Sequence, residues 1–473
     1  MEQNNNLRKL IVIGAGPGGY AAAFHAADLG IKVTIIDKEE NPGGVCLYRG
    51  CIPTKALLHI AKVITDAQKA KDFGVEFGPP NIDIDKVRAW KNSVVKKLTG
   101  GLGQLCKSRK IEYIQASAKF VDANTIEIEK KAGNTERLSF EHAILATGAV
   151  PATLPIAPMD LPGIMDSTAA LELENIPKSL LIIGGGYIGL ELGNAYACLG
   201  SRVSVVEMTP NLMPGSDEEL IKVLAKRLSK LFESIMLNTN VTRLSRTETG
   251  LKASFEGQNV EKKEAVYEKV LVAVGRKPNS ANLGLEQTKV VIDDRGFVRV
   301  DKKCRTNSPS IFAIGDITGP PLLAHRATHQ GIVAAKVIAG FDAVFEPRSI
   351  PFVEYTEPET AECGLSEKQA KAEGRNFRVA RFPWAASGRA TTLGETEGLT
   401  KLIIDADTQR LLGAGIVGTQ AGELISEAAL ALEMAATAPD IAMTIHPHPT
   451  LSETLMEAAS AFLSQSIHIY RRP

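Results

Sequence analysis

The chain has 473 residues, of which 44% are hydrophobic, with 54 basic and 54 acidic side chains. This length exceeds what one ordinary hydrophobic core accommodates, so we expect two to four domains. The balanced charge gives no sign of nucleic acid or of a membrane surface as a partner. No apolar run approaches the roughly 20 residues that a membrane-spanning helix needs.

The N-terminus and the cysteines indicate a cellular compartment. Residues 1–9 are polar and lead into an apolar strand, without the apolar run and cleavage site of a signal peptide. We therefore expect a cytoplasmic protein, in which cysteines are normally reduced. Four of the six cysteines stand alone in the sequence and are interpreted as packing residues. They are Cys106, Cys198, Cys304 and Cys363.

The chain contains two copies of a strand, a glycine-rich turn, a helix and a second strand, over residues 10–37 and 181–207. In this motif the first glycine makes a tight turn, the second lets the backbone approach a pyrophosphate, and the third lets helix pack on strand. The helix N-terminus holds the phosphates. A closing acid accepts hydrogen bonds from ribose hydroxyls and disfavours a 2′-phosphate.

A single motif of this kind could be only a glycine-rich turn. Two copies in the same context, with the closing acid at the same distance from the first glycine, predict that the protein binds two dinucleotides. The residues concerned are Gly14, Gly16, Pro17, Gly18, Gly19 and Asp37 in the first copy, and Gly184, Gly186, Tyr187, Ile188, Gly189 and Glu207 in the second.

Shorter signals come after each copy. Two apolar strands that end in glycine, over residues 142–149 and 269–278, look like duplicated exits from the two units, and a proline-rich candidate linker covers residues 151–162. A strand over residues 310–316 ends in Gly-Asp, so we expect the chain to return to the first domain. We predict an α/β fold with two Rossmann-like dinucleotide-binding domains and a C-terminal α+β domain. The expected divisions are 1–150, 151–275, 276–348 and 349–473.

The segment over residues 43–58 holds the two remaining cysteines, Cys46 and Cys51. In a regular helix they would stand roughly 7.5 Å apart along the axis, whereas a disulfide usually needs Cα atoms within about 6.8 Å. The pair can close only if the chain departs from a regular helix, and Gly50 gives the backbone that latitude. Pro53 suits a first helical turn, which would place Cys51 at the positive end of a helix dipole.

That position favours a thiolate and is typical of an electron-transfer thiol. Two unpaired core cysteines or a metal site are the alternatives. Because only one histidine, His59, lies close by in sequence to complete tetrahedral ligation, no metal is predicted.

A second constellation lies near the C-terminus, in His446-Pro-His-Pro-Thr-Leu-Ser-Glu453. A thiol with a pKa of about 8.5 is mostly protonated at neutral pH, so a thiol substrate needs a base, and histidine is suited to that task. His448 could be the base, with Glu453 holding its tautomer. Alternatively, Glu453 forms a capping box with Thr450 at the start of a helix. The spacing alone leaves both interpretations open.

Taken together, these residues resemble the class I pyridine-nucleotide disulfide oxidoreductases, and within that family the enzymes that oxidise dihydrolipoamide. The resemblance covers essentially the whole chain, and the Gly-Gly-x-Cys-x4-Cys-Ile-Pro-x-Lys motif is highly specific. The chain order in that family is an FAD domain, an NAD domain, a central segment that returns to the FAD domain, and a dimerisation domain. The signals along this chain come in the same order.

The resemblance implies a bound FAD, and oxidation of protein-bound dihydrolipoamide with reduction of NAD+. It also implies a homodimer whose active site is shared between subunits. The expected partner is a lipoyl-bearing acyltransferase or carrier protein of a 2-oxoacid dehydrogenase or glycine cleavage complex.

The resemblance assigns roles to individual residues. Cys51 becomes the sulfur beside the flavin, and Cys46 the sulfur that exchanges with substrate. His448 becomes a base that reaches the disulfide of the second subunit, and Glu453 orients it. Further residues that the resemblance assigns to FAD are Lys38, Gly44, Lys55, Ala118, Thr147, Gly148, Asp316 and Ala324, and to NAD are Val241 and Gly275.

Two charged residues receive a role from the resemblance alone. Lys55 is assigned a place near the flavin, with Glu191 as its carboxylate partner. The sequence without the resemblance suggests surface charges for both.

One departure and three alternatives remain. Leu-Tyr-Arg-Gly stands between the cysteines where the commoner family form has Asn and often Val, which we expect to alter local packing only. A glutathione-type reductase would usually prefer NADPH and carry arginines after the second nucleotide strand. In this chain Glu207 is followed by Met-Thr-Pro instead. A mercuric reductase would usually end in paired cysteines, which residues 469–473 lack. A non-enzymatic role in a large complex is disfavoured by the set Cys46, Cys51 and His448.

Overall fold

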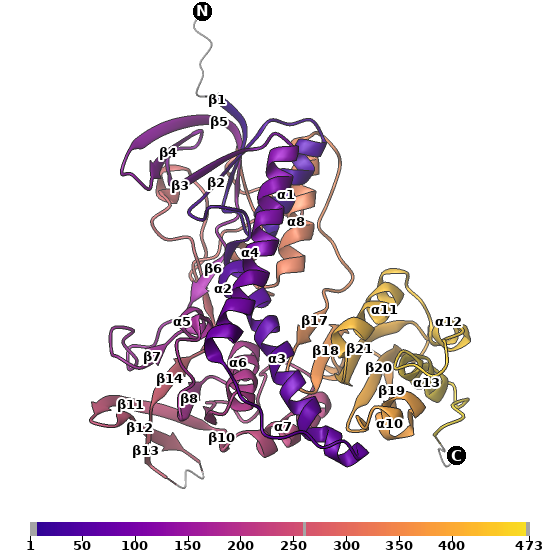
Figure 1. Ribbon diagram of the computed structural model, residues 1–473. Helices are drawn as coiled ribbons and strands as arrows, with labels where there is room; N and C mark the ends of the chain where they lie inside the picture. The colour runs from indigo at the N-terminus through magenta and orange to yellow at the C-terminus, as the bar shows by residue number, and fades with distance from the viewer. Residues whose placement is uncertain (1–6, 259–261, 470–473) are drawn as a thin grey trace, which may run out of the picture.

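The computed structural model describes residues 7–258 and 262–469 (Figure 1). Most of the polar N-terminal stretch on which the expected location rests, residues 1–6, lies outside the described residues, as do residues 470–473. Within the described ranges, none of the helices combines the length and apolar character needed to cross a membrane.

The first sheet is built from segments far apart in the sequence. Its order is β1-β2-β3-β4-β5-β16, and β1 also pairs in parallel with β5. The late strand β16 pairs in parallel with β5, with Ile311 opposite Ala143, so the chain returns to the first sheet after completing the second unit. The strands are β1 (Leu7–Ile13), β2 (Val33–Asp37), β3 (Glu112–Asp122), β4 (Thr125–Lys130), β5 (Thr135–Leu145) and β16 (Ile311–Ala313).

Two small-residue helices cover one side of this sheet, α1 (Pro17–Asp28) and α8 (Ala324–Ile338), which lie side by side (Figure 1). Leu10 and Val12 of β1 are fully buried in a cluster with the alanines of both helices. The helices approach closely because a Cβ at Gly331 would lie 2.5 Å from the Gly18 carbonyl oxygen. This packing brings the start of α8 next to the first glycine turn.

The second sheet repeats the parallel arrangement. Its order is β10-β9-β8-β14-β7, and every pairing is parallel. The strands are β7 (Ile164–Met165), β8 (Ser179–Ile183), β9 (Arg202–Val206), β10 (Ser234–Met236) and β14 (Lys269–Val272), with α5 (Ser167–Glu172), α6 (Tyr187–Cys198) and α7 (Glu218–Leu231). An antiparallel sheet of β11 (Thr239–Thr247), β12 (Gly250–Gly257) and β13 (Glu264–Tyr267) packs beside it.

Two connections join the first and second units. Short strands after the two exits, β6 (Ala149–Pro151) and β15 (Arg276–Pro278), pair antiparallel. The long helix α3 (Cys51–Lys69) comes directly after α2 (Gly44–Arg49) and packs on α6 through Leu57 and Leu58. The 25-residue helix α4 (Ile84–Ser108) also lies against α3.

The C-terminal part forms an antiparallel sheet in the order β17-β18-β21-β20-β19 (Figure 1, orange to yellow). Helix α11 packs on β18 and β21, while α13 packs on β19 and β20. The elements are β17 (Phe352–Glu354), β18 (Glu359–Gly364), α9 (Glu367–Ala372), β19 (Phe377–Pro383), α10 (Gly388–Thr392), β20 (Leu399–Asp405), β21 (Leu411–Gly418), α11 (Ala421–Glu433), α12 (Ala438–Met443) and α13 (Glu453–Phe462).

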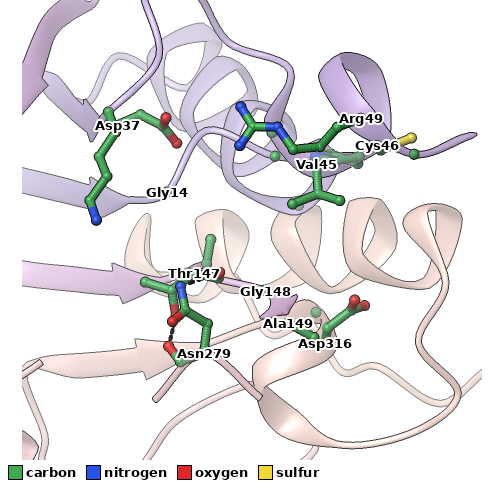
Figure 2. Close-up of a pocket in the computed structure, with 18 of the residues that line it drawn as sticks. Gly14, Asp37, Val45, Cys46, Arg49, Thr147, Gly148, Ala149, Asn279 and Asp316 are labelled. Atoms are coloured by element: carbon green, nitrogen blue, oxygen red, sulfur yellow. Dashed lines mark hydrogen bonds between the residues drawn. The ribbon is translucent and has the colours of Figure 1, made fainter. Parts of the chain in front are cut away.

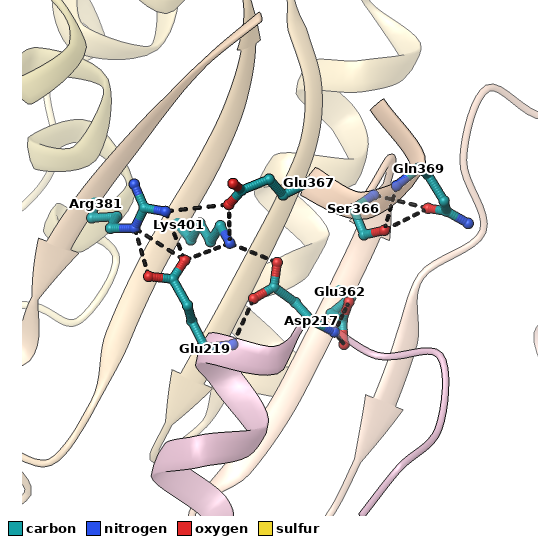
Figure 3. A network of polar contacts seen from close by, with 8 residues as sticks. All are labelled: Asp217, Glu219, Glu362, Ser366, Glu367, Gln369, Arg381 and Lys401. Carbon is teal, nitrogen blue, oxygen red and sulfur yellow. Dashed lines mark hydrogen bonds and ion pairs between the residues drawn. The ribbon is translucent and has the colours of Figure 1, made fainter. Parts of the chain in front are cut away.

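An ion-pair network around a buried lysine connects this sheet to the second unit (Figure 3). Lys401 of β20 is only 3% exposed, and its Nζ lies 2.7 Å from Asp217 Oδ2 and 2.5 Å from Glu219 Oε2, at the start of α7. Glu367 and Arg381 complete the network. Separating a buried charge from its partner costs free energy. The ion pairs of Lys401 therefore hold the start of α7 against the C-terminal sheet.

Candidate functional site

A cavity of about 710 Å³ lies between the first glycine turn, α2 and α3 on one side and the exit strand and residues 279–316 on the other (Figure 2). Every residue predicted to bind FAD lines this cavity except Gly19. Those that line it are Gly14, Gly16, Pro17, Gly18, Asp37, Lys38, Gly44, Lys55, Ala118, Thr147, Gly148, Asp316 and Ala324.

The first glycine turn has the backbone geometry that the motif requires. Gly14 has a φ of +99°, and a Cβ there would lie 2.4 Å from the Ala146 carbonyl oxygen at the end of β5. A Cβ at Gly19 would lie 1.9 Å from the Gly14 carbonyl oxygen, so Gly19 packs helix on turn instead of facing the cavity. Gly16 caps α1 without a side-chain hydrogen bond, and a Cβ there would meet only Gly44, at 3.9 Å. The amides at the start of α1 can therefore be approached by a phosphate.

Asp37 stands at the end of β2, at the cavity wall. Its Oδ2 accepts a hydrogen bond from Ala15 N at 2.6 Å, and its Oδ1 accepts one from Glu39 N at 2.9 Å. Burial raises the pKa of Asp37, and the hydrogen bond from the Ala15 amide opposes the effect. The carboxyl group is held in one orientation and keeps free lone pairs for the hydroxyls of a ribose.

The two cysteines face each other across a break in the helix. α2 ends at Arg49 and α3 begins at Cys51, because Gly50 adopts φ −146° and ψ −117°. This confirms the predicted departure from a regular helix. Both cysteines are free thiols here and line the cavity, Cys46 half-buried and Cys51 exposed at the cavity wall. Cys106, Cys304 and Cys363 are buried and Cys198 is half-buried, as packing residues are.

The two thiols have different acidities. The side-chain hydrogen bond with Cys46 lowers the pKa of Cys51 to about 7 against the effect of burial, and the charge of Lys55 lowers it further. The same hydrogen bond, with burial, raises the pKa of Cys46. Cys51 is also the first residue of α3, where the helix dipole favours an anion. Cys51 is therefore the sulfur that becomes a thiolate first.

Lys55, one turn further along α3, forms a bidentate ion pair with Glu191 of α6. Its Nζ lies 2.9 Å and 2.8 Å from the two carboxylate oxygens, and Glu191 is 3% exposed. Tyr355 N donates to Glu191 Oε1 at 3.0 Å, and the Tyr355 ring centroid lies 4.4 Å from Lys55 Nζ. The sequence alone suggests a surface position for both residues. For Glu191 this is wrong, because its side chain is buried against Lys55 of α3, a helix far away in the sequence.

The second glycine turn repeats the first. Gly184 has a φ of +110°, and Glu207 Oε2 and Oε1 accept hydrogen bonds from Gly185 N at 2.7 Å and Thr209 N at 2.8 Å. A Cβ at Gly186 would meet nothing within 4 Å. Glu207 is 7% exposed, and an acid there would bind the ribose of an unphosphorylated NAD.

The other residues predicted for NAD surround this turn. Tyr187 and Ile188 line the first cavity, and Tyr187 also lines a second cavity of about 460 Å³ together with Gly186. Val241 of β11 is buried in the core, so only its backbone could contact NAD. The predicted residues that line neither cavity are Gly184, Gly189, Glu207, Val241 and Gly275.

His448 lies in the loop between α12 and α13, and Glu453 is the first residue of α13. His448 Nδ1 lies 2.9 Å from Glu453 Oε1, while Glu453 Oε2 accepts from Thr450 N at 2.7 Å. The contact with the histidine is present, but the capping box with Thr450 is wrong, because α13 begins at Glu453 with Ser452 as its N-cap and without a side-chain capping hydrogen bond. Neither residue lines the first cavity, and the His448 side chain is 74% exposed. One chain alone does not bring His448 to Cys46.

The cavity also contains residues that the motifs did not indicate, Arg49, Arg276 and Asn279. Thr147 Oγ1 donates to the Asn279 carbonyl oxygen at 2.8 Å (Figure 2). This hydrogen bond holds the turn after β5 against the segment after β15. Arg276 and Asn279 come just after the glycine of the second exit strand, a position that could have indicated them. No group of three or more potential metal ligands is present within residues 7–258 and 262–469.

Comparison with known proteins gives matches along nearly the whole chain. The pyridine nucleotide-disulphide oxidoreductase model matches residues 8–331, and the dimerisation domain of the same family matches residues 350–459. The chain belongs to the pyridine nucleotide-disulphide oxidoreductase family. The family named from the motifs is confirmed, together with two dinucleotide-binding folds and a dimerisation domain.

The most similar relatives include the dihydrolipoyl dehydrogenases of Vibrio cholerae, 50% identical over 96% of this chain and 95% of the relative, and Thermus scotoductus, 47% identical over 98% and 99%. Among solved structures, LpdA from Mycobacterium tuberculosis has a TM-score of 0.89 at 26% identity, over 96% of this chain and 99% of that chain. The Cu(II) complex of the HOCl-induced flavoprotein disulfide reductase RclA from Escherichia coli has a TM-score of 0.86 at 27% identity, with the same coverage.

The dimerisation domain explains the exposed apolar side chains beside His448. Met443 and Ile445 are 82% and 95% exposed in the single chain, which is unusual for large apolar residues outside an interface. The match over residues 350–459 includes both and supports a homodimer.

Proposed function

We propose that this protein oxidises protein-bound dihydrolipoamide to lipoamide and reduces NAD+ to NADH, with FAD as bound cofactor and Cys46 and Cys51 as the redox-active pair. The observation that carries the proposal is the position of both thiols on the wall of the cavity that also contains the first glycine turn. Relatives that are 44% to 50% identical and carry the name dihydrolipoyl dehydrogenase support this substrate.

The residues of the first cavity fit FAD. The amides at the start of α1 would hold the pyrophosphate, Asp37 a ribose, Asp316 the ribityl chain, and Lys55 would lie near the flavin ring. FAD, when bound, supplies the two-electron transfer between the dithiol and NAD. The second glycine turn would hold NAD, with Glu207 on a ribose and with Tyr187 and Ile188 where the two units meet.

The chain's own residues divide the thiol chemistry. Cys46 is the sulfur that exchanges with the lipoyl group, and Cys51 remains as the thiolate, because its pKa is lowered to about 7. His448 of the second subunit is the base that removes a thiol proton from the substrate. With Glu453 accepting from His448 Nδ1, the other ring nitrogen is left to accept that proton.

The remaining expectations belong to the same proposal. The lipoyl group comes from an acyltransferase or carrier protein of a 2-oxoacid dehydrogenase or glycine cleavage complex, and the protein acts in the cytoplasm. The domains divide near residues 150, 275 and 348. A mercuric or other disulfide reductase would share the dithiol, but the named relatives favour dihydrolipoamide.

The test is turnover of dihydrolipoamide with NAD+ by the purified holoenzyme and by Cys46→Ser. We expect the variant to retain FAD and to lose at least roughly 10³-fold in kcat, because the nucleophile is removed. Cys198→Ala is the matched control, a half-buried cysteine outside the cavity, and should retain turnover. Full lipoamide turnover by Cys46→Ser would refute the thiol assignment.

A further inference from the structure

A fully buried carboxyl group, Glu354, lies beside the ion pair of the dithiol site. Glu354 is the last residue of β17 and is 0% exposed. Its Oε2 accepts a hydrogen bond from Thr360 Oγ1 at 3.1 Å. Its Oε1 has no hydrogen-bond partner within residues 7–258 and 262–469. A carboxylate with so little support would be costly to bury.

The packing of β17 against α6 fixes the place of this carboxyl group. Alternate residues of a strand share a face, so Phe352 and Glu354 lie on the same side of β17. The Phe352 ring contacts the Tyr187 ring of α6, with centroids 5.7 Å apart. Glu191 stands one helical turn after Tyr187 and accepts from the amide of Tyr355, the residue after Glu354. Glu354 is therefore enclosed next to the Lys55–Glu191 pair.

The charges around Glu354 are unbalanced. Glu191 of α6, Glu362 of β18 and Lys55 of α3 are the charged groups that face it. Glu362 also feels the charge of Lys401, whereas Glu354 and Glu191 have Lys55 between them. Glu362 lies opposite Phe352 in the sheet, hence on the same face, and its carboxyl group accepts from Asp217 N. If Glu354 and Glu191 were both ionised beside the single charge of Lys55, their net negative charge would oppose a further anion at Cys51.

Protonation of Glu354 removes this conflict. Burial, and after it the charge of Glu191, raises the pKa of Glu354 to about 8. Burial likewise raises the pKa of Glu362 to about 7. At neutral pH Glu354 is therefore mostly a neutral acid, and Lys55 pairs with one carboxylate, Glu191, at 2.8 Å.

We propose that Glu354 is a positioning residue of the dithiol centre, which holds a proton at neutral pH so that Lys55 keeps its charge available to the thiolate at Cys51. This inference rests on the proposed function, because it needs a thiolate beside a bound flavin. Neither the glycine motifs nor the cysteine motif indicates Glu354, and the usual expectation for a glutamate is a surface position.

The inference predicts how the thiolate titrates. Two acids that repel each other titrate over a wider pH range than one acid, so ionisation of Glu354 should delay completion of Cys51 ionisation. In the reduced holoenzyme, the long-wavelength absorbance of a thiolate against flavin should rise along a broadened curve between about pH 6 and pH 9. In Glu354→Gln, which is neutral and of similar shape, it should trace a single-proton curve that is complete at lower pH.

The matched control is Glu362→Gln, which removes a buried acid of the same sheet face that does not adjoin the Lys55–Glu191 pair. The broadened curve should persist in this variant, displaced to lower pH, because the charge of Glu362 contributes to the raised pKa of Glu354. As a second readout, reduced-minus-oxidised infrared spectra of Glu362→Gln at pH 7 should contain a carbonyl stretch of a protonated carboxylic acid that the double variant with Glu354→Gln lacks. If Glu354→Gln does not retain FAD, Glu354→Ala is measured in its place.

The outcomes separate the two claims. A wild-type protein without any long-wavelength band on reduction would contradict the proposed function. A wild-type band whose titration is unchanged in the neutral Glu354 variant would overturn the role of Glu354 and leave the proposed function intact. An infrared carbonyl signal that persists in the double variant would do the same.

Discussion

The two nucleotide units share the same turn but differ in the segment after the closing acid. Asp37 and Glu207 accept hydrogen bonds from equivalent amides, one after the first glycine and one two residues beyond the acid. After Asp37 the chain enters α2 and α3 with their two cysteines, whereas after Glu207 it enters a loop and α7.

This difference assigns the two units to different partners. The first turn opens into the 710 Å³ cavity that contains the thiols, while the second turn lies where α6 meets the C-terminal sheet. A shared motif therefore defines the class of ligand. The segment inserted after it decides which dinucleotide takes part in thiol chemistry.

The clearest way to distinguish the ligands of the two nucleotide units is to block each glycine turn with the same substitution. Valine at Gly14 or at Gly184 places a Cβ 2.4 Å from a carbonyl oxygen, of Ala146 or Ala273, at a positive φ. We expect Gly14→Val to abolish FAD binding. Gly184→Val should keep FAD but lower NADH-dependent dye reduction at least about tenfold, through strain of about 1–3 kcal/mol in the turn. Absorbance spectra and dye reduction measure both, and loss of FAD from Gly184→Val alone would reverse the assignment.

Removing the base should spare both nucleotide units. Because His448 lies outside both, His448→Gln is expected to lower dihydrolipoamide turnover by roughly 10²–10⁴-fold, the range of a general base. NADH-dependent dye reduction, which needs no substrate base, should be retained. Equal loss of both activities would show that the histidine supports folding or dimerisation instead. Sedimentation of the variant distinguishes a broken dimer.

Removing the carboxylate of Glu207 should have a smaller effect on turnover than removing His448. Glu207→Ala removes a hydrogen-bonding carboxylate of the kind worth about 1.5–3 kcal/mol, so we expect KM for NAD+ to rise roughly tenfold or more. FAD content should stay unchanged, and the preference for NAD+ over NADP+ should weaken. An unchanged KM would indicate that Glu207 serves only the turn, through Gly185 and Thr209.

The smallest predicted change is an electrostatic one in the first unit. The charge of Lys55 lowers the pKa of Cys51, so its removal in Lys55→Met should raise that pKa by about one unit. At pH 7 the thiolate fraction would then fall from about half to about a tenth. The long-wavelength absorbance of the reduced enzyme against pH measures this shift, and a shift to lower pH would contradict the assigned charge effect.

The sequence predicts the features that depend on neighbouring residues. The glycine turns, the helix break at Gly50 and the start of α3 near Pro53 result from local backbone preferences. The buried place of Glu191 could not be predicted locally, because its partners Lys55 and Tyr355 come from α3 and from the end of β17. The residues whose function depends on contacts between domains are the ones that sequence motifs leave out.

The most direct test of the central claim compares the absorbance spectra of Cys46→Ser and Cys51→Ser as purified with FAD, at about pH 8, where a thiol of lowered pKa is ionised. If Cys51 faces the flavin, Cys46→Ser leaves its thiolate there and shows the long-wavelength band without added reductant, while Cys51→Ser shows none. A band in Cys51→Ser, or in neither variant, would contradict the placement of Cys51 beside the flavin.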